Sequence, residues 1–423
     1  MKESFERFDM TKPPVRTKWY LHPVTILISL PEVIAHRMKL TKKGTEGLKP
    51  PYILLCNHNA FFDFKAATKA IWPARANYVV AIDGFIGREK LLRDVGCICK
   101  RKFTNDITLV RNLKKTLNNG DVAVVYPEAR YSLCGTTAVL PRSLGKMCKL
   151  FGVPVVTFIC HGHHVNSPFW NLHPRKVKPT EAEMTLLFTP DELKKLSVDE
   201  INERIVGAFK YDDFAWQKER GILTPYPKRA EGLHKVLYQC PACGREFRMA
   251  SEGSELYCSA CGKRWEMTEL GELRAKDGET EFSHIPDWYE WERANVRQEV
   301  ESGAYSSGRL NVTVDSLPNA KKFIRLGKGT MIHDMNGFRV EGTDVDGDPF
   351  LMEKPVPSLY SCHIEYDYLG KNGDCVDLNT LEDTWYIYPE GKDFSVTKMA
   401  LATEELYFDH MRREGKPCPD GLA

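Results

Sequence analysis

The stretch YILLCNHNAFFD, from Tyr52 to Asp63, decides the fold of the first half of this 423-residue chain. Its first five residues are apolar, which is typical of a strand that is buried on both faces. Polar residues then interrupt the run, and helical spacing follows from Phe64 to Ile71. A buried strand that leads directly into a helix predicts a layered α/β fold.

The same alternation of strands and helices continues along the chain. A helix is predicted over 104–119, with an apolar face and Gly120 as its stop. Ser197 and Glu200 predict a capping box at the start of a later helix. We therefore expect a mixed sheet flanked by helices over residues 1–230. The other predicted strands are NYVVAI (77–82), GCIC (96–99), DVAVVY (121–126) and VPVVTF (153–158).

His58 and Asp63 bracket the junction between the first strand and its helix. Because open α/β sheets bind ligands beyond the ends of their strands, we expect the His58 imidazole to be exposed there. A carboxylate at the start of the helix can hold one ring nitrogen of His58 and leave the other to take a proton from a hydroxyl. No GxSxG nucleophile elbow occurs in the chain. The pattern therefore predicts acyl transfer without a protein nucleophile.

Three further blocks follow in order, each at the end of an expected strand. They are GCICKR (96–101), YPEARYS (126–132) and VPVV (153–156). Together with NHNAFFD, this succession resembles the four blocks of the lysophosphatidic acid acyltransferase family, over roughly residues 20–210.

The resemblance implies a set of site residues. In that family the His–Asp pair is catalytic, the second block supplies an arginine for the acceptor phosphate, and the third helps to bind the acceptor. The implied catalytic residues are His58, as general base, and Asp63. The implied substrate-binding residues are Asn57, Arg101, Glu128 and Arg130.

This sequence departs from the family pattern in the blocks that bind the acceptor. Ala129 stands where the family has glycine, and the block's arginine comes one place early, so that Tyr131 takes its usual position. Thr157 stands where proline is common. Within the run KRK, Lys100 or Lys102 is an alternative to Arg101 as the phosphate ligand. The pattern thus defines the reaction more closely than the acceptor.

The resemblance implies transfer of an acyl chain from acyl-coenzyme A or acyl-carrier protein to a hydroxyl of a lysophospholipid such as 1-acylglycerol-3-phosphate. The alternatives are acyl transfer to another acceptor, ester hydrolysis, and a non-catalytic lipid-binding scaffold. Three histidines in CHGHHVNSPFW (160–170) are interpreted as polar lining of the acceptor pocket, with a metal site as the alternative.

Two CxxC pairs, CPACG at 240–244 and CSACG at 258–262, are separated by fourteen residues. Four thiolates in this spacing predict a closed, structural Zn²⁺ site, and the glycine after each pair permits a tight turn. A rubredoxin-like iron site is the alternative. We expect a zinc ribbon over 236–275, in which acidic residues offset the basic ones, so nucleic acid is not the expected partner. The four ligands are Cys240, Cys243, Cys258 and Cys261.

A third module is expected towards the end of the chain, after a helical connector over 276–304. Between 305 and 412, apolar and polar residues alternate, glycine and asparagine mark the turns, and the segment TKMALATEELYFDHM closes with helical spacing. Antiparallel strands followed by one helix resemble a pleckstrin-homology-like β-barrel.

Charge is distributed unevenly along the chain. Residues 1–150 carry 26 Lys and Arg against 12 Asp and Glu, whereas residues 301–423 carry 13 against 21. A cationic first third suits partners that bear phosphate, such as anionic lipid headgroups, coenzyme A or nucleic acid, and does not choose among them; a solvated surface is the alternative. The run VTILISLPEVIA (24–35) is too short to span a bilayer and is interpreted as an interfacial helix or a half-buried packing helix.

The expected location is cytoplasmic, peripheral to the inner face of a membrane. The N-terminus MKESFERFDM lacks the apolar core of a signal peptide. Most cysteines outside the CxxC pairs lie in apolar runs, which is typical of a reducing compartment.

Overall fold

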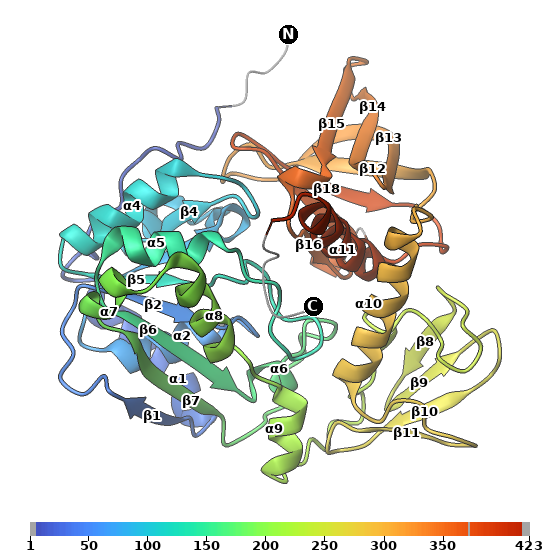
Figure 1. The fold of residues 1–423 in the computed structure, drawn as a ribbon, viewed down its shortest axis with the longest axis horizontal. Helices are drawn as coiled ribbons and strands as arrows, with labels where there is room; N and C mark the ends of the chain where they lie inside the picture. Colours follow the sequence, from blue (N-terminus) through green and yellow to red (C-terminus); the bar gives the residue numbers. More distant parts are fainter. Residues whose placement is uncertain (1–5, 371–372, 417–423) are drawn as a thin grey trace.

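The computed structural model describes residues 6–370 and 373–416 (Figure 1). Two parts of the sequence interpretation lie outside the described residues. They are residues 1–5 of the N-terminus, which lacks the features of a signal peptide, and residues 371–372 of the predicted β-barrel. Three sheets follow one another along the chain, with seven, four and seven strands in the described ranges. We refer to residues 6–219, 233–275 and 310–413 as the first, second and third modules.

The sheet of the first module is mixed, as the sequence predicts, and its strand order is β1-β7-β6-β2-β5-β3-β4. Neighbours run parallel except β6 and β7. Because β2 is central, the turn that follows it emerges in the middle of the sheet edge. The strands are β1 (Lys39–Lys43), β2 (Tyr52–Cys56), β3 (Ala76–Ala81), β4 (Ile98–Lys100), β5 (Val122–Val125), β6 (Val155–His161) and β7 (Glu181–Phe188).

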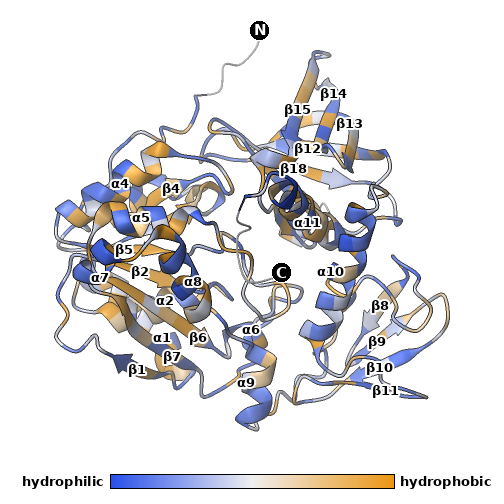
Figure 2. Cartoon of the chain, in the orientation of Figure 1, coloured by the Kyte–Doolittle hydropathy of each residue, from blue (hydrophilic) through white to orange (hydrophobic). Residues whose placement is uncertain are grey.

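Helices cover both faces of this sheet. Leu54 of β2 packs in a cluster with the buried alanines of α2, whereas Ile53 and Leu55 pack in a second cluster with α4, α5 and α8. Every residue of β2 is therefore buried, which explains its continuous apolar run. Figure 2 shows the apolar strands enclosed between more polar helices.

The helices of the first module begin and end near the positions that the sequence predicts. Ser197 and Glu200 form the predicted capping box at the start of α8: Glu200 N donates to Ser197 Oγ (3.2 Å), and Ser197 N donates to Glu200 Oε2 (2.7 Å). The helices are α1 (His22–Ala35), α2 (Phe62–Ile71), α3 (Glu89–Asp94), α4 (Ile107–Asn118), α5 (Ser143–Phe151), α6 (His163–Asn166), α7 (Pro190–Lys195), α8 (Val198–Ala208) and α9 (Asp213–Glu219).

The second module is a small antiparallel sheet in the order β11-β10-β9-β8. It carries the four cysteines of the CxxC pairs, and α10 (Ile285–Glu301) follows it within the predicted connector. The strands are β8 (Met249–Glu252), β9 (Glu255–Cys258), β10 (Arg264–Met267) and β11 (Leu273–Ala275).

The third module is one antiparallel sheet in the order β15-β14-β13-β12-β18-β17-β16, closed by α11 (Val396–Arg413). No ladder of the described residues joins its edge strands β15 and β16, so the sheet is open there and the predicted barrel closure is not found. The strands are β12 (Leu310–Ser316), β13 (Ile324–Asp334), β14 (Gly337–Asp344), β15 (Pro349–Pro355), β16 (His363–Glu365), β17 (Cys375–Asn379) and β18 (Thr384–Pro389).

A continuous apolar core crosses the boundaries between the modules. Trp170 of the first module, Trp265 of the second and Leu401 of α11 belong to one buried cluster. α10 packs against α11 between the second and third modules (Figure 1). The third module is therefore fixed against the loops that follow the strands of the first. In the described residues, no helix is long and apolar enough to cross a membrane.

Candidate active site and cysteine cluster

The candidate active site lies at the end of β2, where a short turn leads into α2. His58 lies in this turn and Asp63 in the first turn of α2. Asp63 Oδ2 accepts hydrogen bonds from the backbone N–H groups of Asn59 (2.6 Å) and Ala60 (2.9 Å). The turn is thus closed around the carboxylate, whose charge is favoured at the positive end of the helix dipole.

His58 contacts the same carboxylate. Its Nδ1 lies 3.3 Å from Asp63 Oδ2, and its side chain is 24% exposed whereas that of Asp63 is 0% exposed. Because an ionised carboxylate can only accept, this contact favours the tautomer with the proton on Nδ1. Nε2 of a neutral His58 is then free to accept a proton.

A second histidine holds Asp63 from its other side. His163 Nδ1 lies 2.5 Å from Asp63 Oδ1, and both side chains are buried. Burial alone would raise the pKa of Asp63, but the hydrogen bonds from His163 and His58 outweigh it and hold that pKa well below its usual value. Asp63 is therefore a carboxylate at neutral pH. The sequence placed His163 in a pocket lining; its position just after β6, beside β2, is the signal for the contact.

Two tyrosines enclose the ring of His58. The sequence did not predict them as site residues. The centroids of Tyr126 and Tyr131 each lie 4.3 Å from that of His58. Both come from the segment that follows β5, the other neighbour of β2. Burial raises the pKa of each phenol, so neutral hydroxyl groups flank the imidazole.

Glu128 supports the turn that contains His58. Its Oε1 accepts the backbone N–H of His58 (3.0 Å), and its Oε2 accepts that of Ala138 (2.8 Å). Burial raises the pKa of Glu128 to about 8. Both oxygens of this predicted substrate-binding residue are thus engaged by the backbone. The next residue, Ala129, has φ 55°, so the left-handed turn that favours glycine persists without it.

Arg101 and Arg130 are engaged by the third module. The buried guanidinium of Arg101 donates to the carbonyls of Leu317, Pro318 and Glu382 and to Thr384 Oγ1, at 2.7–3.1 Å. The structure therefore does not bring Arg101 together with His58 as a free phosphate ligand.

Arg130 is also buried, and its Nη2 lies 2.7 Å from Glu404 of α11. A local sequence pattern identifies these cations but gives no sign of a module more than 200 residues away that covers them.

The remaining predicted acceptor ligands also have protein partners. Asn57 bridges β2 and β6 through Cys160, donating to its carbonyl (2.9 Å) and accepting its N–H (2.8 Å). Lys100 donates to Thr104 Oγ1 (3.0 Å), and Lys102 lies 3.4 Å from Asp377 of the third module. Asn57 thus connects the two strands, and its predicted role in substrate binding stays a prediction.

The four cysteines of the CxxC pairs converge in the second module. The Sγ atoms of Cys240 and Cys261 are 3.8 Å apart, those of Cys243 and Cys258 are 3.9 Å apart, and all four lie within 4.8 Å of one another. A tetrahedral Zn²⁺ with Zn–S bonds of about 2.3 Å requires sulfur separations of about 3.8 Å. The donor set therefore fits a four-thiolate metal ion.

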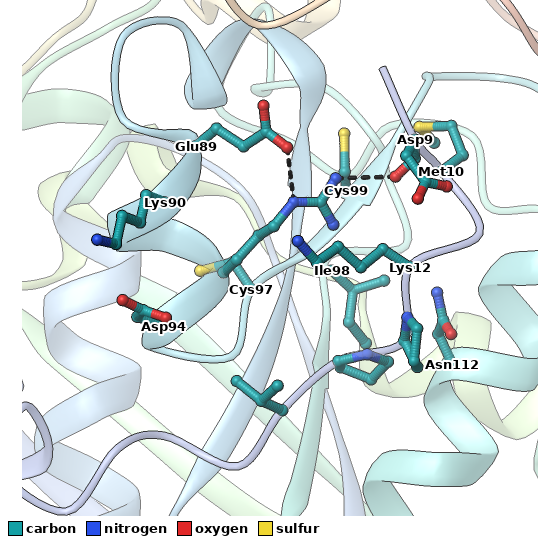
Figure 3. A pocket seen from close by; sticks show the side chains of 14 residues that line it. Asp9, Met10, Lys12, Glu89, Lys90, Asp94, Cys97, Ile98, Cys99 and Asn112 are labelled. Carbon is teal, nitrogen blue, oxygen red and sulfur yellow. Dashed lines mark hydrogen bonds and ion pairs between the residues drawn. The ribbon is translucent and has the colours of Figure 1, made fainter. Parts of the chain in front are cut away.

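A cavity of about 540 Å³ lies elsewhere in the first module, between the N-terminal segment and α3 with β4 (Figure 3). Arg93 crosses it and donates to Glu89 Oε1 (2.7 Å) and to the carbonyl of Asp9 (2.8 Å). Its lining mixes acids and bases and includes none of the residues around His58. The cavity is therefore separate from the His58 site.

Part of the first module is similar to a known protein family. Residues 33–161 match the family model described as Acyltransferase, and this range contains His58, Asp63 and the tyrosines around them. Over these residues the chain is similar to the acyltransferase family.

Among solved structures, the chain is similar to the 1-acyl-sn-glycerophosphate (LPA) acyltransferase PlsC from Thermotoga maritima. The sequence identity is 15% and the TM-score is 0.35, and the match covers 45% of this chain and 79% of that one. No curated protein matches the sequence.

Proposed function

We propose that this chain transfers an acyl chain from an acyl thioester, acyl-coenzyme A or acyl-carrier protein, to a hydroxyl of a lysophospholipid such as 1-acylglycerol-3-phosphate. The family match of residues 33–161 supports acyl transfer. The observation that carries the proposal is the partly exposed His58, held on Nδ1 by a buried carboxylate, with no hydrogen bond from Nε2 to the described residues. An imidazole held in this way is suited to act as a general base.

The proposed reaction proceeds by direct attack of the acceptor. His58 Nε2 takes the hydroxyl proton as the oxygen attacks the thioester carbonyl, and the C–O bond forms. The tetrahedral intermediate then collapses, the C–S bond breaks, and the leaving thiolate takes the proton from Nε2. Asp63 stabilises the imidazolium that exists between the two steps.

Replacement of His58 tests the proposal. His58→Ala is expected to lower turnover by about 100- to 10,000-fold in an assay with a labelled acyl donor and a panel of lysolipids. His173→Ala, at an exposed histidine outside the site, is the matched control. Undiminished turnover by a folded His58→Ala variant would overturn the assignment. Release of free fatty acid without acylated lipid would instead favour the hydrolase alternative.

The contacts of Arg101 and Arg130 bear on the acceptor. As both cations are paired with the third module, an acceptor phosphate would have to bind other groups or displace these contacts. Comparing a lysophospholipid with a neutral monoacylglycerol separates the two cases, because only the first needs a phosphate ligand. Preferred use of the neutral acceptor would rule out the phosphorylated one.

We also propose that α1 rests on an anionic membrane. Its inner face packs on the module through Ile26 and Val33, whereas its outer face and the preceding turn expose apolar side chains. Arg37 and Lys39 are exposed where the helix ends, which suits anionic headgroups. The exposed apolar set is Trp19, Tyr20, Val24, Leu27, Ile28 and Ile34.

The active site lies close to this surface. Phe61, which immediately precedes α2, is 64% exposed, and α2 packs beside α1. A membrane under α1 would therefore bring lipid to the turn that holds His58. This arrangement supports a peripheral enzyme whose acceptor arrives from the bilayer.

We propose that Cys240, Cys243, Cys258 and Cys261 hold a structural Zn²⁺, which would tie the two knuckles of the second module together. All four tetrahedral positions are then taken by protein, so the metal would have no part in the reaction. Metal analysis of the purified protein is expected to give one zinc per chain. Stoichiometric iron would contradict zinc in favour of the rubredoxin-like alternative.

A further inference from the structure

Asp63 lies between two imidazoles, and the tighter contact is not the one to His58. The distance from Asp63 Oδ1 to His163 Nδ1 is 2.5 Å, against 3.3 Å from Oδ2 to His58 Nδ1. The side chains of Asp63 and His163 are both 0% exposed. Each carboxylate oxygen thus has its own histidine.

The fold builds this contact specifically. β6 pairs in parallel with β2, with Phe158 opposite Cys56, so the two strands end at the same sheet edge. Gly162 then turns the chain at φ 84°, and a Cβ at this position would lie 2.7 Å from the ring of Trp216. Only glycine fits this turn without a shift of Trp216, and the turn delivers His163 to Asp63.

The contact with Asp63 is the one polar interaction of the His163 side chain among the described residues. Its ring packs on Phe62, with the centroids 4.5 Å apart, and its buried Nε2 has no hydrogen-bond partner within the described part of the chain. An unsatisfied buried nitrogen costs stability, which an apolar side chain of similar size would avoid. Packing alone therefore does not account for histidine at this position.

We propose that His163 is a positioning residue for the general base. Its Nδ1–H donates to Asp63 Oδ1 and fixes the plane of the carboxylate, so that Oδ2 stays directed at His58 Nδ1. The inference rests on the proposed function of His58, and extends the His–Asp pair to a His163–Asp63–His58 relay of hydrogen bonds. His163 itself contacts neither reacting atom.

The electrostatics give the expected sign of a pH effect. Burial favours the protonated form of Asp63 and the two histidine hydrogen bonds oppose it, so loss of His163 raises the pKa of Asp63. A protonated Asp63 no longer accepts from His58 Nδ1 as a carboxylate does. Activity that depends on the charged form is then lost at a higher pH than in the wild type.

Besides His58 and His163, which contact Asp63 directly, seven further titratable groups around it add little to this readout. The thiols and phenols have pKa values raised by burial, His164 has a pKa lowered by burial to about 4, and Glu128 has one raised to about 8. Between pH 5 and 7 the protonation of these groups therefore stays nearly constant. The groups are Cys56, Cys160, Tyr126, Tyr131, Tyr211, His164 and Glu128.

Three variants test the inference. His163→Leu removes the donor and fills the space, whereas His163→Asn keeps an N–H donor near the position of Nδ1. The sequence grouped His164 with the pocket-lining histidines, but the structure buries its side chain completely against Trp170 and Phe214, without contact to Asp63 among the described residues. His164→Leu is therefore the matched control. Steady-state kinetics from pH 5 to 8 and thermal unfolding are measured for each variant in the full-length protein.

In metal sites, loss of a hydrogen bond that orients a ligating histidine or carboxylate typically costs about 10- to 100-fold in activity, and a similar range is expected for a carboxylate that orients a general base. We expect a fall of that size in kcat for His163→Leu, with KM within about twofold of the wild type. The acid limb of its kcat/KM profile is expected to move to higher pH. His163→Asn should recover most of the turnover and the wild-type limb, and His164→Leu should keep both.

Two outcomes would overturn the inference while leaving the proposed function intact. One is a His163→Leu variant with the turnover and acid limb of the wild type. The other is an equal loss in His163→Leu and His163→Asn that follows their melting temperatures, as for a packing position. Failure of the proposed function is seen separately, in a wild-type protein without acyl transfer or a His58→Ala variant with full activity.

A measurement that does not depend on activity tests the His163 contact even if the proposed function fails. In the proton NMR spectrum, the short hydrogen bond predicts a strongly downfield imidazole N–H signal that is absent from His163→Leu and retained in His164→Leu. Persistence of the signal in His163→Leu would assign it to another histidine and contradict the relay.

Discussion

Glu128 illustrates how much of the site depends on backbone geometry. Its two oxygens accept from His58 N and Ala138 N, and so connect the turn after β2 to the loop after β5. Glu128 was expected to bind the acceptor because the family block contains it. Its contacts give the carboxyl group a structural task, which is to fix the main chain of the proposed general base, and acceptor binding by Glu128 stays a prediction.

Replacing Glu128 by glutamine should therefore impair the protein although the shape is kept. In Glu128→Gln the side-chain amide presents an NH₂ group to one of the two backbone N–H donors. That donor is left buried and unpaired, at a cost of about 1–3 kcal/mol in the free energy of unfolding. Turnover should fall through displacement of His58 rather than through weaker acceptor binding. Urea unfolding and the separate kcat and KM values check this.

Glu192→Gln offers a control for that substitution. Glu192 also accepts a backbone N–H, from Thr189, but in an exposed helix cap. Water can replace the lost acceptor there, so the effect on stability should be smaller and turnover should not change. A larger loss in the exposed variant would contradict the role given to Glu128.

At the scale of elements, the buried strands were predictable and their neighbours in space were not. β2, β5 and β6 are apolar at nearly every position because both faces of the sheet are covered, and that signal is local. His163 follows β6 and lies more than 100 residues after His58 in the sequence. Its contact with Asp63 arises only from the pairing of β2 with β6, which periodicity cannot give.

The helix α1 shows the same division. Its sequence allowed either an interfacial helix or a half-buried packing helix, and the structure combines an inner face that packs with an outer apolar face that does not. Apolar residues on both sides of one helix hide the 3.6-residue period from which a choice could be made. The contacts with α2 were needed to separate the two faces.

The outer face of α1 gives a prediction for membrane binding. Leu27→Asp with Ile28→Asp should weaken binding to vesicles that contain phosphatidylglycerol by about 100-fold or more, because burial of each side chain is worth about 1.5–3 kcal/mol. Flotation or sedimentation with vesicles measures the change. Activity on a short-chain, monomeric lysolipid should be retained, since neither residue contacts the His58 turn.

Leu381→Asp is the control for the charge change, because Leu381 is 56% exposed and lies between β17 and β18 of the third module. It should bind vesicles as the wild type does. Neutral phosphatidylcholine vesicles should bind the wild type more weakly, as Arg37 and Lys39 contribute only with anionic lipid. Unchanged binding by the α1 variant would exclude this face as the membrane contact.

On the scale of the whole molecule, some cations of the first module pair with acidic residues of the third module rather than facing an external partner. The excess of positive charge in residues 1–150 and of negative charge in 301–423 predicted a phosphate-bearing partner. Part of that complementarity is used within the chain, as Lys102 pairs with Asp377 and Arg130 with Glu404. Net charge counts cannot distinguish an internal partner from an external one, because both satisfy the same side chains.

Glu404 lies at the centre of the buried ion pairs between the modules, which we call the buried seam. Its replacement tests how much these ion pairs stabilise the contact between the modules. Its carboxylate lies 2.7 Å from both Arg130 of the first module and Arg293 of α10, and it is fully buried. Glu404→Gln should lower the free energy of unfolding by about 3–5 kcal/mol, because two buried guanidinium groups lose their shared counter-charge.

Glu301→Gln is the matched control on the same helix pair. Glu301 of α10 lies 3.2 Å from Arg412 of α11, with both side chains about half exposed, so its loss should cost less than about 1 kcal/mol. Comparable urea midpoints for the two variants would show that the buried seam contributes no more than a surface ion pair. Turnover should also fall in Glu404→Gln, because Arg130 lies next to Tyr131 in the sequence. A loss of stability and turnover in this variant alone would show that the arrangement of the active site depends on the third module.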